Sequence, residues 1–108
     1  MTDFDEATKM MLRNMLLGRW AAKRLGLTNG ETDVYANALA KDALDPERSD
    51  VFTKIRQDFD AAGVIETDKQ ILEVMTELTI KAGSQLSIRD GGVQGTAAVL
   101  IARNLTSR

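Results

Sequence analysis

The chain contains neither cysteine nor histidine, and its 108 residues include one proline and one tryptophan. Without cysteine there is no disulfide framework, no thiolate nucleophile and no thiolate metal ligand. Without histidine the chain also lacks the commonest zinc ligand and the one side chain that titrates near neutral pH unaided. The usual nucleophile and base pairs of enzymes are therefore excluded, and we expect no catalytic residues and no metal site.

Long hydrophobic runs are also missing. No run of apolar residues approaches the roughly 18 that a membrane span requires. The first residues, MTDFDEATK, are acidic where a secretory signal is basic. At 44% apolar and 28% charged residues the composition is that of a folded globular chain. We expect one cytoplasmic domain without direct membrane insertion.

Charge nearly cancels overall but is unevenly distributed. The net charge is −2, yet residues 7–30 carry five basic residues and no acidic one, while residues 31–80 carry twelve acidic against five basic residues. A basic first helix beside an acidic remainder can bind phosphate groups or an acidic partner. We favour the simpler interpretation, in which the first helix faces the acidic helices of its own domain.

The stretch MLLGRWAAKRLGLT, residues 15–28, combines the tryptophan, a basic run and a helix stop. Gly26 can adopt the left-handed conformation that closes a helix, and Leu27 can fold back on the last turn, as in a Schellman motif. We predict a helix from about Asp5 or Thr8 to Leu25. Apolar residues at helical spacing give its expected buried face, which consists of Met11, Met15, Leu16, Trp20 and Leu25.

Two capping boxes mark later helix starts, Thr28 with Glu31 and Thr67 with Gln70. The second helix should end at Asp45-Pro46, because the residue before proline avoids the helical conformation. A third helix is predicted from a cap at Ser49 or Asp50 to Gly63, and a fourth from Thr67 to near Ile88. Their expected apolar faces are Val34, Tyr35, Ala38, Leu39 and Leu44; Val51, Phe52, Ile55, Phe59 and Ala62; and Ile71, Leu72, Met75, Leu78, Ala82 and Leu86.

Four amphipathic helices joined by short loops indicate an antiparallel bundle, and no segment alternates at period two. The predicted fold class is all-α, a four-helix bundle over residues 1–90 with a C-terminal extension at residues 91–108. The apolar run at residues 96–102 leaves two alternatives open, a short fifth helix or a loosely ordered extension.

Two local features allow both a binding and a structural interpretation. Asp42, Asp45, Glu47 and Asp50 crowd one loop, but their spacing does not match a calcium loop, which favours a solvated acidic loop. Trp20 can stack on a base or anchor a partner, although a lone tryptophan on an apolar helix face is more often core. Nucleic acid is not an expected partner, because the chain is acidic and has few aromatic residues.

Several strings of the sequence match those of one known family. They are LLGRWAAKRLGLT at residues 16–28, Tyr35-Ala36, DVF at 50–52, KIR at 54–56 and DFDAAGV at 58–64. In this order and spacing, over about residues 14–80, the chain resembles the zeta subunit family, the ATPase inhibitor subunits of alphaproteobacterial rotary ATP synthases. The resemblance implies a four-helix bundle that regulates and is not an enzyme.

The same resemblance implies that the chain binds the catalytic head of the rotary ATP synthase, peripheral to the inner membrane, and blocks ATP hydrolysis with its N-terminal segment. It also implies ADP or ATP as an optional ligand. A wedge that fits one rotary state stabilises that state and stalls turnover. A frayed helix start is the alternative role for this segment. The residues available for the wedge are Asp3, Phe4, Asp5, Glu6, Met10, Met11 and Leu12.

The sequence departs from the family pattern in the tail beyond Ile88, which has no family counterpart, and in three further places. About a dozen residues precede Arg13-Asn14, where the family has a longer charged stretch, Arg19 replaces an apolar residue, and Lys69 replaces a common histidine. If the longer stretch is the inhibitory segment, the chain docks without inhibiting. The alternative function is then a nucleotide-sensing bundle or a diverged paralogue that has lost inhibition.

For the nucleotide we predict a site at the basic end of the first helix, because guanidinium groups suit phosphate and aromatic faces suit adenine. A third alternative is an enzyme that acts through Asp58 and Asp60, although both lie on the polar face of the third helix, where solvation explains them. The predicted nucleotide-binding residues are Arg19, Trp20, Lys23, Arg24 and Tyr35.

Overall fold

The computed structural model describes residues 3–47 and 50–90, and the side chains of residues 6–47 and 50–86. Within these ranges it contains four α-helices and no strand, which confirms the predicted all-α four-helix bundle. The predicted extension at residues 91–108, with its two alternatives, lies outside the described residues. The helices are α1 at Asp3–Leu25, α2 at Asn29–Asp42, α3 at Val51–Ala62 and α4 at Asp68–Asp90.

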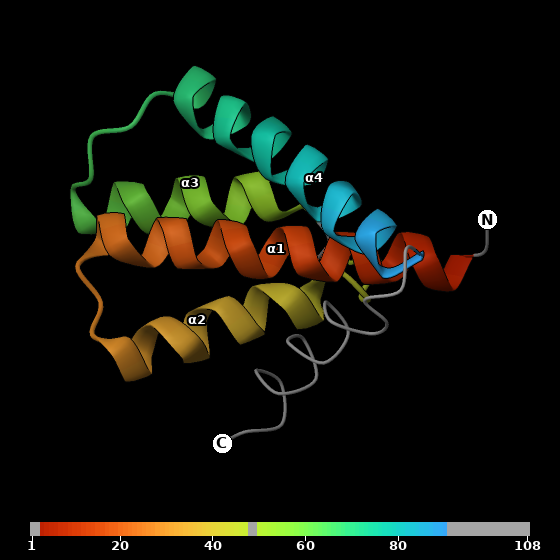
Figure 1. Ribbon diagram of the computed structural model, residues 1–108. Coiled ribbons are helices and arrows are strands. Elements are labelled where there is room, and N and C mark those ends of the chain that lie inside the picture. The colour runs from red at the N-terminus through yellow and green to blue at the C-terminus, as the bar shows by residue number, and fades with distance from the viewer. Residues whose placement is uncertain (1–2, 48–49, 91–108) are drawn as a thin grey trace.

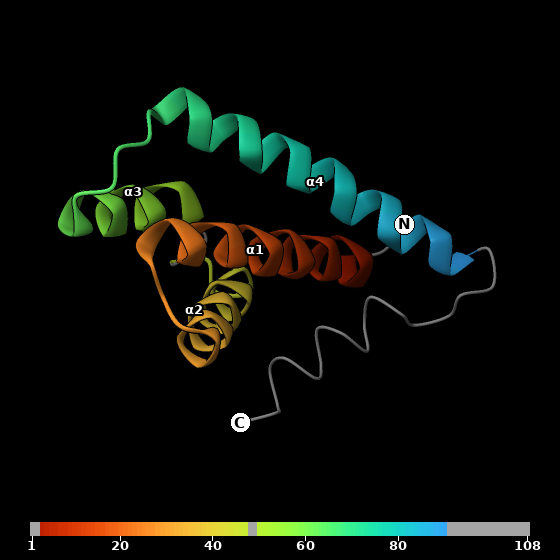
Figure 2. The same ribbon diagram turned by 60° about the vertical axis from the view of Figure 1, so that its left-hand side comes forward.

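The first helix, α1, is the central element of the bundle. It lies between α2 on one side and α3 with α4 on the other (Figure 1). In the view turned by 60°, the C-terminal half of α4 still lies beside the N-terminal half of α1, while α3 lies near the other end of α1 (Figure 2). Consecutive helices run in alternating directions, as the short connections between them require.

Two glycines end helices in the predicted way. Gly26 has φ of 79° and Gly63 has φ of 74°, in the left-handed region that glycine adopts without steric cost. The N–H of Leu27 donates to the carbonyl of Ala22 at 3.0 Å, and the N–H of Val64 donates to that of Phe59 at 2.9 Å. Both bonds close a Schellman motif, so α1 ends at Leu25 as expected.

Side-chain caps fix where the other helices begin. The Thr28 amide donates to Glu31 at 2.9 Å while the Glu31 amide donates to the Thr28 hydroxyl at 3.3 Å, which completes the first capping box. Thr67 and Gln70 make the equivalent bonds at 2.8 and 3.1 Å. Asp50 caps α3 by accepting from the Thr53 amide at 3.1 Å. The predicted starts of α2, α3 and α4 are therefore confirmed.

The core consists of two clusters along α1. The alanine-rich cluster joins its N-terminal half to α2 and α4, and the aromatic cluster joins its C-terminal half to all three other helices. The first comprises Leu12, Met15, Ala36, Ala40, Ala82 and Leu86. The second comprises Leu17, Ala21, Leu39, Val51, Ile55, Phe59 and Ile71, with Trp20, Tyr35 and Phe52 among the half-buried residues around it.

The predicted buried face of α1 was too narrow. Leu12, Leu17 and Ala21 are fully buried, whereas Met11, Leu16 and Trp20 are only half-buried. The reason is that α1 is covered from two sides, so its buried sector is wider than the single stripe of a surface helix.

Five residues that the spacing placed on apolar faces are instead exposed. The α2 helix ends at Asp42, three residues before Asp45, so the last of its predicted apolar residues lies in the following turn. Its buried side is formed by Ala36, Leu39 and Ala40. The exposed residues are Val34, Ala38, Leu44, Ala62 and Leu72.

Small side chains set the distance between α1 and α2. A Cβ added at Gly18 would lie 2.8 Å from the Cα of Ala36 and 3.2 Å from a methyl group of Leu39. Contacts below 3.0 Å to backbone atoms are not tolerated without movement, so glycine at this position allows the two helices to approach closely. The buried side chain of Asn14 joins the same pair by donating to the carbonyl of Leu39 at 2.9 Å.

Candidate functional site

The predicted nucleotide-binding residues at the end of α1 point to different neighbours. Arg19 pairs with Asp33 of α2 at 3.3 Å. Arg24 pairs with Glu66, in the connection between α3 and α4, where the glutamate side chain is 3% exposed. Lys23 is exposed. Both arginines are therefore neutralised by acidic residues of the same domain, as the simpler interpretation of the charge pattern predicts.

The aromatic members of the predicted site belong largely to the core. The ring of Trp20 packs against that of Phe59, with 5.6 Å between centroids and 59° between planes. The Arg24 guanidinium lies 6.0 Å from the centroid of the Trp20 ring, within cation–π range. Trp20 thus joins α1 to α3, which supports its structural interpretation.

Tyr35 is held in a polar cluster between α2 and α3. Its hydroxyl donates to Asp58 at 2.6 Å, Lys54 pairs with the same carboxylate at 3.2 Å, and the Lys54 ammonium lies 5.9 Å from the tyrosine ring. Burial, together with the hydrogen bond to Asp58, raises the pKa of the Tyr35 hydroxyl, so it stays a proton donor. Of the five predicted residues, Arg24 and Trp20 lie together, while Arg19 and Tyr35 have other partners and Lys23 is exposed. The nucleotide site stays a prediction.

Arg24 and Arg56 form hydrogen bonds and ion pairs with the connection between α3 and α4. The sequence pattern did not predict these contacts. Arg56 donates to the carbonyl of Glu66 at 2.8 Å and pairs with Asp60 and Asp68, both at 2.9 Å. The hydrogen bond to Asp68 is the largest cause that raises the pKa of Arg56. With Arg24 on the buried Glu66 side chain, these bonds hold the loop against the ends of α1 and α3. Asp58 and Asp60 are thus both paired with bases.

The predicted inhibitory segment forms the first turns of α1. Asp3, Phe4 and Asp5 belong to the helix, and their side chains lie outside the described ones. Glu6 is exposed, and Met10 and Met11 are half-buried. Leu12 is 1% exposed in the alanine-rich cluster, so its side chain is not accessible to a partner. The accessible part of this segment therefore ends before Leu12.

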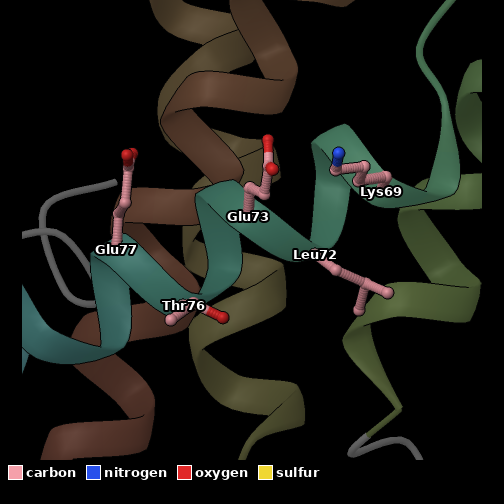
Figure 3. Close-up of a pocket in the computed structure, with 5 residues that line it drawn as sticks. All are labelled: Lys69, Leu72, Glu73, Thr76 and Glu77. Atoms are coloured by element: carbon pink, nitrogen blue, oxygen red, sulfur yellow. The ribbon is translucent and has the colours of Figure 1, made fainter.

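One face of α4 carries a shallow groove. Glu73 and Glu77 project to one side of the helix, while Leu72 projects toward α3 (Figure 3). Leu72 is 48% exposed. None of the predicted nucleotide-binding residues is among those that line it, which are Lys69, Leu72, Glu73, Thr76 and Glu77.

The acidic loop after α2 is shaped by hydrogen bonds to its own backbone. Asp45 accepts from the amide of Glu47 at 2.9 Å, and Asp50 caps α3. Hydrogen bonds to Thr53 lower the pKa of Asp50. Among the described residues no group of three or more carboxylates is arranged to hold a metal ion.

A second polar network crosses the bundle near the middle of α1. Arg13 Nε donates to Asn14 Oδ1 at 2.7 Å, and Arg13 Nη1 donates to the Thr79 hydroxyl of α4 at 3.3 Å. The Thr79 hydroxyl donates in turn to the carbonyl of Met75 at 2.7 Å. Burial lowers the pKa of Arg13, although the group remains charged at neutral pH. Arg13 was not among the predicted site residues.

A family model described as ATPase inhibitor subunit zeta matches residues 3–85. The chain belongs to this family. The matched range includes all of α1, α2 and α3 and most of α4, and thus also the predicted inhibitory segment. No curated protein and no solved structure matches the chain.

Membership in the zeta family assigns a general role. The family name is that of an ATPase inhibitor subunit, which implies regulation of an ATPase and not catalysis. No described helix has the length and apolarity that a membrane crossing needs.

Proposed function

We propose that this zeta-family chain binds the catalytic head of the rotary ATP synthase and blocks ATP hydrolysis, with the start of α1 as the inserting element. The observation that carries the proposal is the family match, which begins at residue 3 and so includes the first turns of α1. It is supported by the position of those turns at one end of the bundle (Figure 1).

The mechanism needs no chemical step by the inhibitor. A rotary head passes through different arrangements of its catalytic subunits, and a helix that fits only one of them lowers the free energy of that arrangement. Glu6 and Met10 are the described side chains best placed for such contacts, because one is exposed and the other belongs to neither core cluster. Leu12 anchors the helix to the bundle behind them.

The first experiment measures ATP hydrolysis by the purified cognate head with increasing amounts of the chain, together with binding of the chain to the head. We expect saturable binding and inhibition by the wild type. In Met10→Asp we expect at least about tenfold weaker inhibition, because a charged group replaces an apolar contact. The matched control is Val34→Asp, the same kind of change at a position on α2 that is 60% exposed.

The outcomes separate three possibilities. Inhibition that Met10→Asp reduces and Val34→Asp leaves intact supports the start of α1 as the wedge. Binding without inhibition by the wild type supports instead a docking protein that has lost its blocking segment. A wild-type chain that does not bind the head at all contradicts the proposal.

A further inference from the structure

Arg13 differs from the other described arginines in having no acidic partner. Arg19, Arg24 and Arg56 each pair with carboxylates of the domain. The described partners of Arg13 are an amide oxygen and a hydroxyl, and it forms no ion pair with any described side chain. In a chain with more acidic than basic residues, an arginine without a carboxylate is the exception.

The surroundings hold the Arg13 guanidinium in one orientation. The buried Asn14 side chain is itself fixed by its bond to the carbonyl of Leu39, and Thr79 is fixed by its bond to Met75. These bonds use Nε and Nη1, so the N–H groups of Nη2 donate to no described acceptor. An oriented guanidinium with free donors is pre-organised for a planar oxyanion.

The local charge around Arg13 also favours an anion. Residues 7–30 contain no acidic residue, and Lys9, which pairs with Glu6 at 3.8 Å, lies one turn before Arg13 on the same side of α1. Lys9 reaches α4 as well, since its Cδ lies 3.6 Å from the position of a Cβ at Gly83. Arg13 is half-buried, and a half-buried cation without a counter-charge has lost hydration that no opposite charge replaces.

We propose that Arg13, held by Asn14 and Thr79, binds a carboxylate side chain of the protein partner. The inference rests on the proposed function, because the partner meant is the catalytic head. A single carboxylate matches the single charge of one guanidinium, and the N–H groups of Nη2 are available to donate to its oxygens. A multiply charged phosphate is usually bound by several cations, and Lys9, one turn before Arg13, already pairs with Glu6 at 3.8 Å.

The first test does not require the synthase. It follows the Arg13 Nε–H signal by NMR during titration with sodium acetate, with sodium chloride at equal ionic strength as the control. We expect acetate to shift the Arg13 signal saturably, and the signals of Arg19, Arg24 and Arg56 to move less, because their guanidinium groups are already paired. The Arg13 signal is assigned by its loss in Arg13→Lys.

Two results of this titration overturn the proposal. One is an Arg13 signal that does not move, or that moves equally with chloride, which leaves Arg13 a structural residue. The other comes from the same titration with inorganic phosphate or ADP in place of acetate. A stronger response to either of these makes the site one for phosphate groups.

The second test measures binding to the purified head. Arg13→Gln keeps an amide that can donate to Thr79 but removes the charge, and we expect binding about tenfold weaker or more. Arg13→Lys keeps the charge and should therefore lose less affinity for the head than Arg13→Gln. The control is Lys81→Gln, an equal change of charge at an exposed position of α4, which should bind like the wild type.

Folding is checked by thermal unfolding of each variant. Arg13→Gln should have nearly the stability of the wild type, because it removes a half-buried charge without a counter-ion but also the bond to the buried Asn14 side chain. Wild-type affinity in Arg13→Gln contradicts the inference even if inhibition by the wild type is confirmed. A wild-type chain that does not bind the head contradicts the proposed function, while the acetate titration still decides the role of Arg13.

Discussion

The two core clusters along α1 differ in what fills them. The alanine-rich cluster takes half of its buried members from alanine. Its other buried members are Leu12, Met15 and Leu86, and the half-buried Met11 and Leu16 pack against them. The aromatic cluster buries Phe59 and four branched aliphatic side chains besides Leu17, and Trp20, Tyr35 and Phe52 surround it. Because hydrophobic stabilisation scales with the apolar area removed from water, the aromatic cluster holds more of the folding free energy.

This difference extends to how the two ends of α1 are held. The aromatic cluster and the arginine bonds to the α3–α4 connection fix the C-terminal end of the helix. Among the described side chains, those that bury the N-terminal half are smaller, and local opening is easiest where little apolar surface is buried. An element that inserts into a partner is best placed at such an end, since it adjusts to the partner at low cost.

The largest expected effect contrasts one substitution in each cluster. Phe59→Ala should lower the free energy of unfolding by about 3–5 kcal/mol, because it leaves a large cavity among residues from all four helices. Leu12→Ala should cost about 2–3 kcal/mol, near the lower end for such changes, because its small neighbours allow the site to collapse. Denaturant unfolding of the two variants and the wild type measures both losses in free energy. An equal or larger loss in Leu12→Ala would show that the two clusters contribute alike and would break the comparison.

Alanine substitutions at Gly18 and Gly83 should change the free energy of unfolding by smaller amounts and in opposite directions. They test how closely α1 packs against α2 and against α4. Gly18→Ala places a methyl group 2.8 Å from the Ala36 backbone, so we expect a net loss of about 1–3 kcal/mol despite the better helix propensity of alanine. Gly83→Ala meets only the Cδ of Lys9 at 3.6 Å, an ordinary contact. It should therefore gain up to about 1 kcal/mol. Thermal unfolding of both variants measures the two signs, and a stabilising Gly18→Ala would mean that α1 and α2 have room to separate.

Local sequence signals predicted the elements well because they act over a few residues. The glycine stops at Gly26 and Gly63 and the two capping boxes depend only on neighbouring residues, and the structure confirms each of them. Burial was predicted less well because it depends on how helices are placed. The spacing of Leu12 and Leu17 became meaningful only once α2 and α4 were known to cover α1 from two sides.

The candidate site shows the same division between local and long-range information. Charge pattern alone correctly indicated that α1 faces acidic residues of its own domain, but it did not reveal which arginine lacks an acidic partner. The partners of Arg13 and Arg24 include Thr79 and Glu66, which are 66 and 42 residues away along the chain. Such pairs follow from helix packing, and no motif of closely spaced residues predicts them.

The smallest expected effect concerns the capping boxes of α2 and α4, near the C-terminal end of α1. The box of α2 contains the carboxylate of Glu31, whereas that of α4 contains the amide of Gln70. Hydrogen bonds to Thr28 lower the pKa of Glu31, whereas Gln70 does not titrate. A carboxylate with a lower pKa in the folded state stabilises above its unfolded pKa of about 4.3, and this stabilisation is lost as the pH falls through the folded pKa.

Acid should therefore loosen the start of α2 before that of α4. We expect the wild type to take up more protons on unfolding between about pH 3 and pH 5 than Glu31→Gln does, with a difference below one proton because a single group titrates. Unfolding free energies measured across this range give the proton uptake. Hydrogen exchange of the first α2 and α4 amides locates the change. Equal pH dependence in wild type and Glu31→Gln would assign the acid response to other carboxylates, of which Asp50 is the first candidate, since its pKa is lowered by its bonds to Thr53.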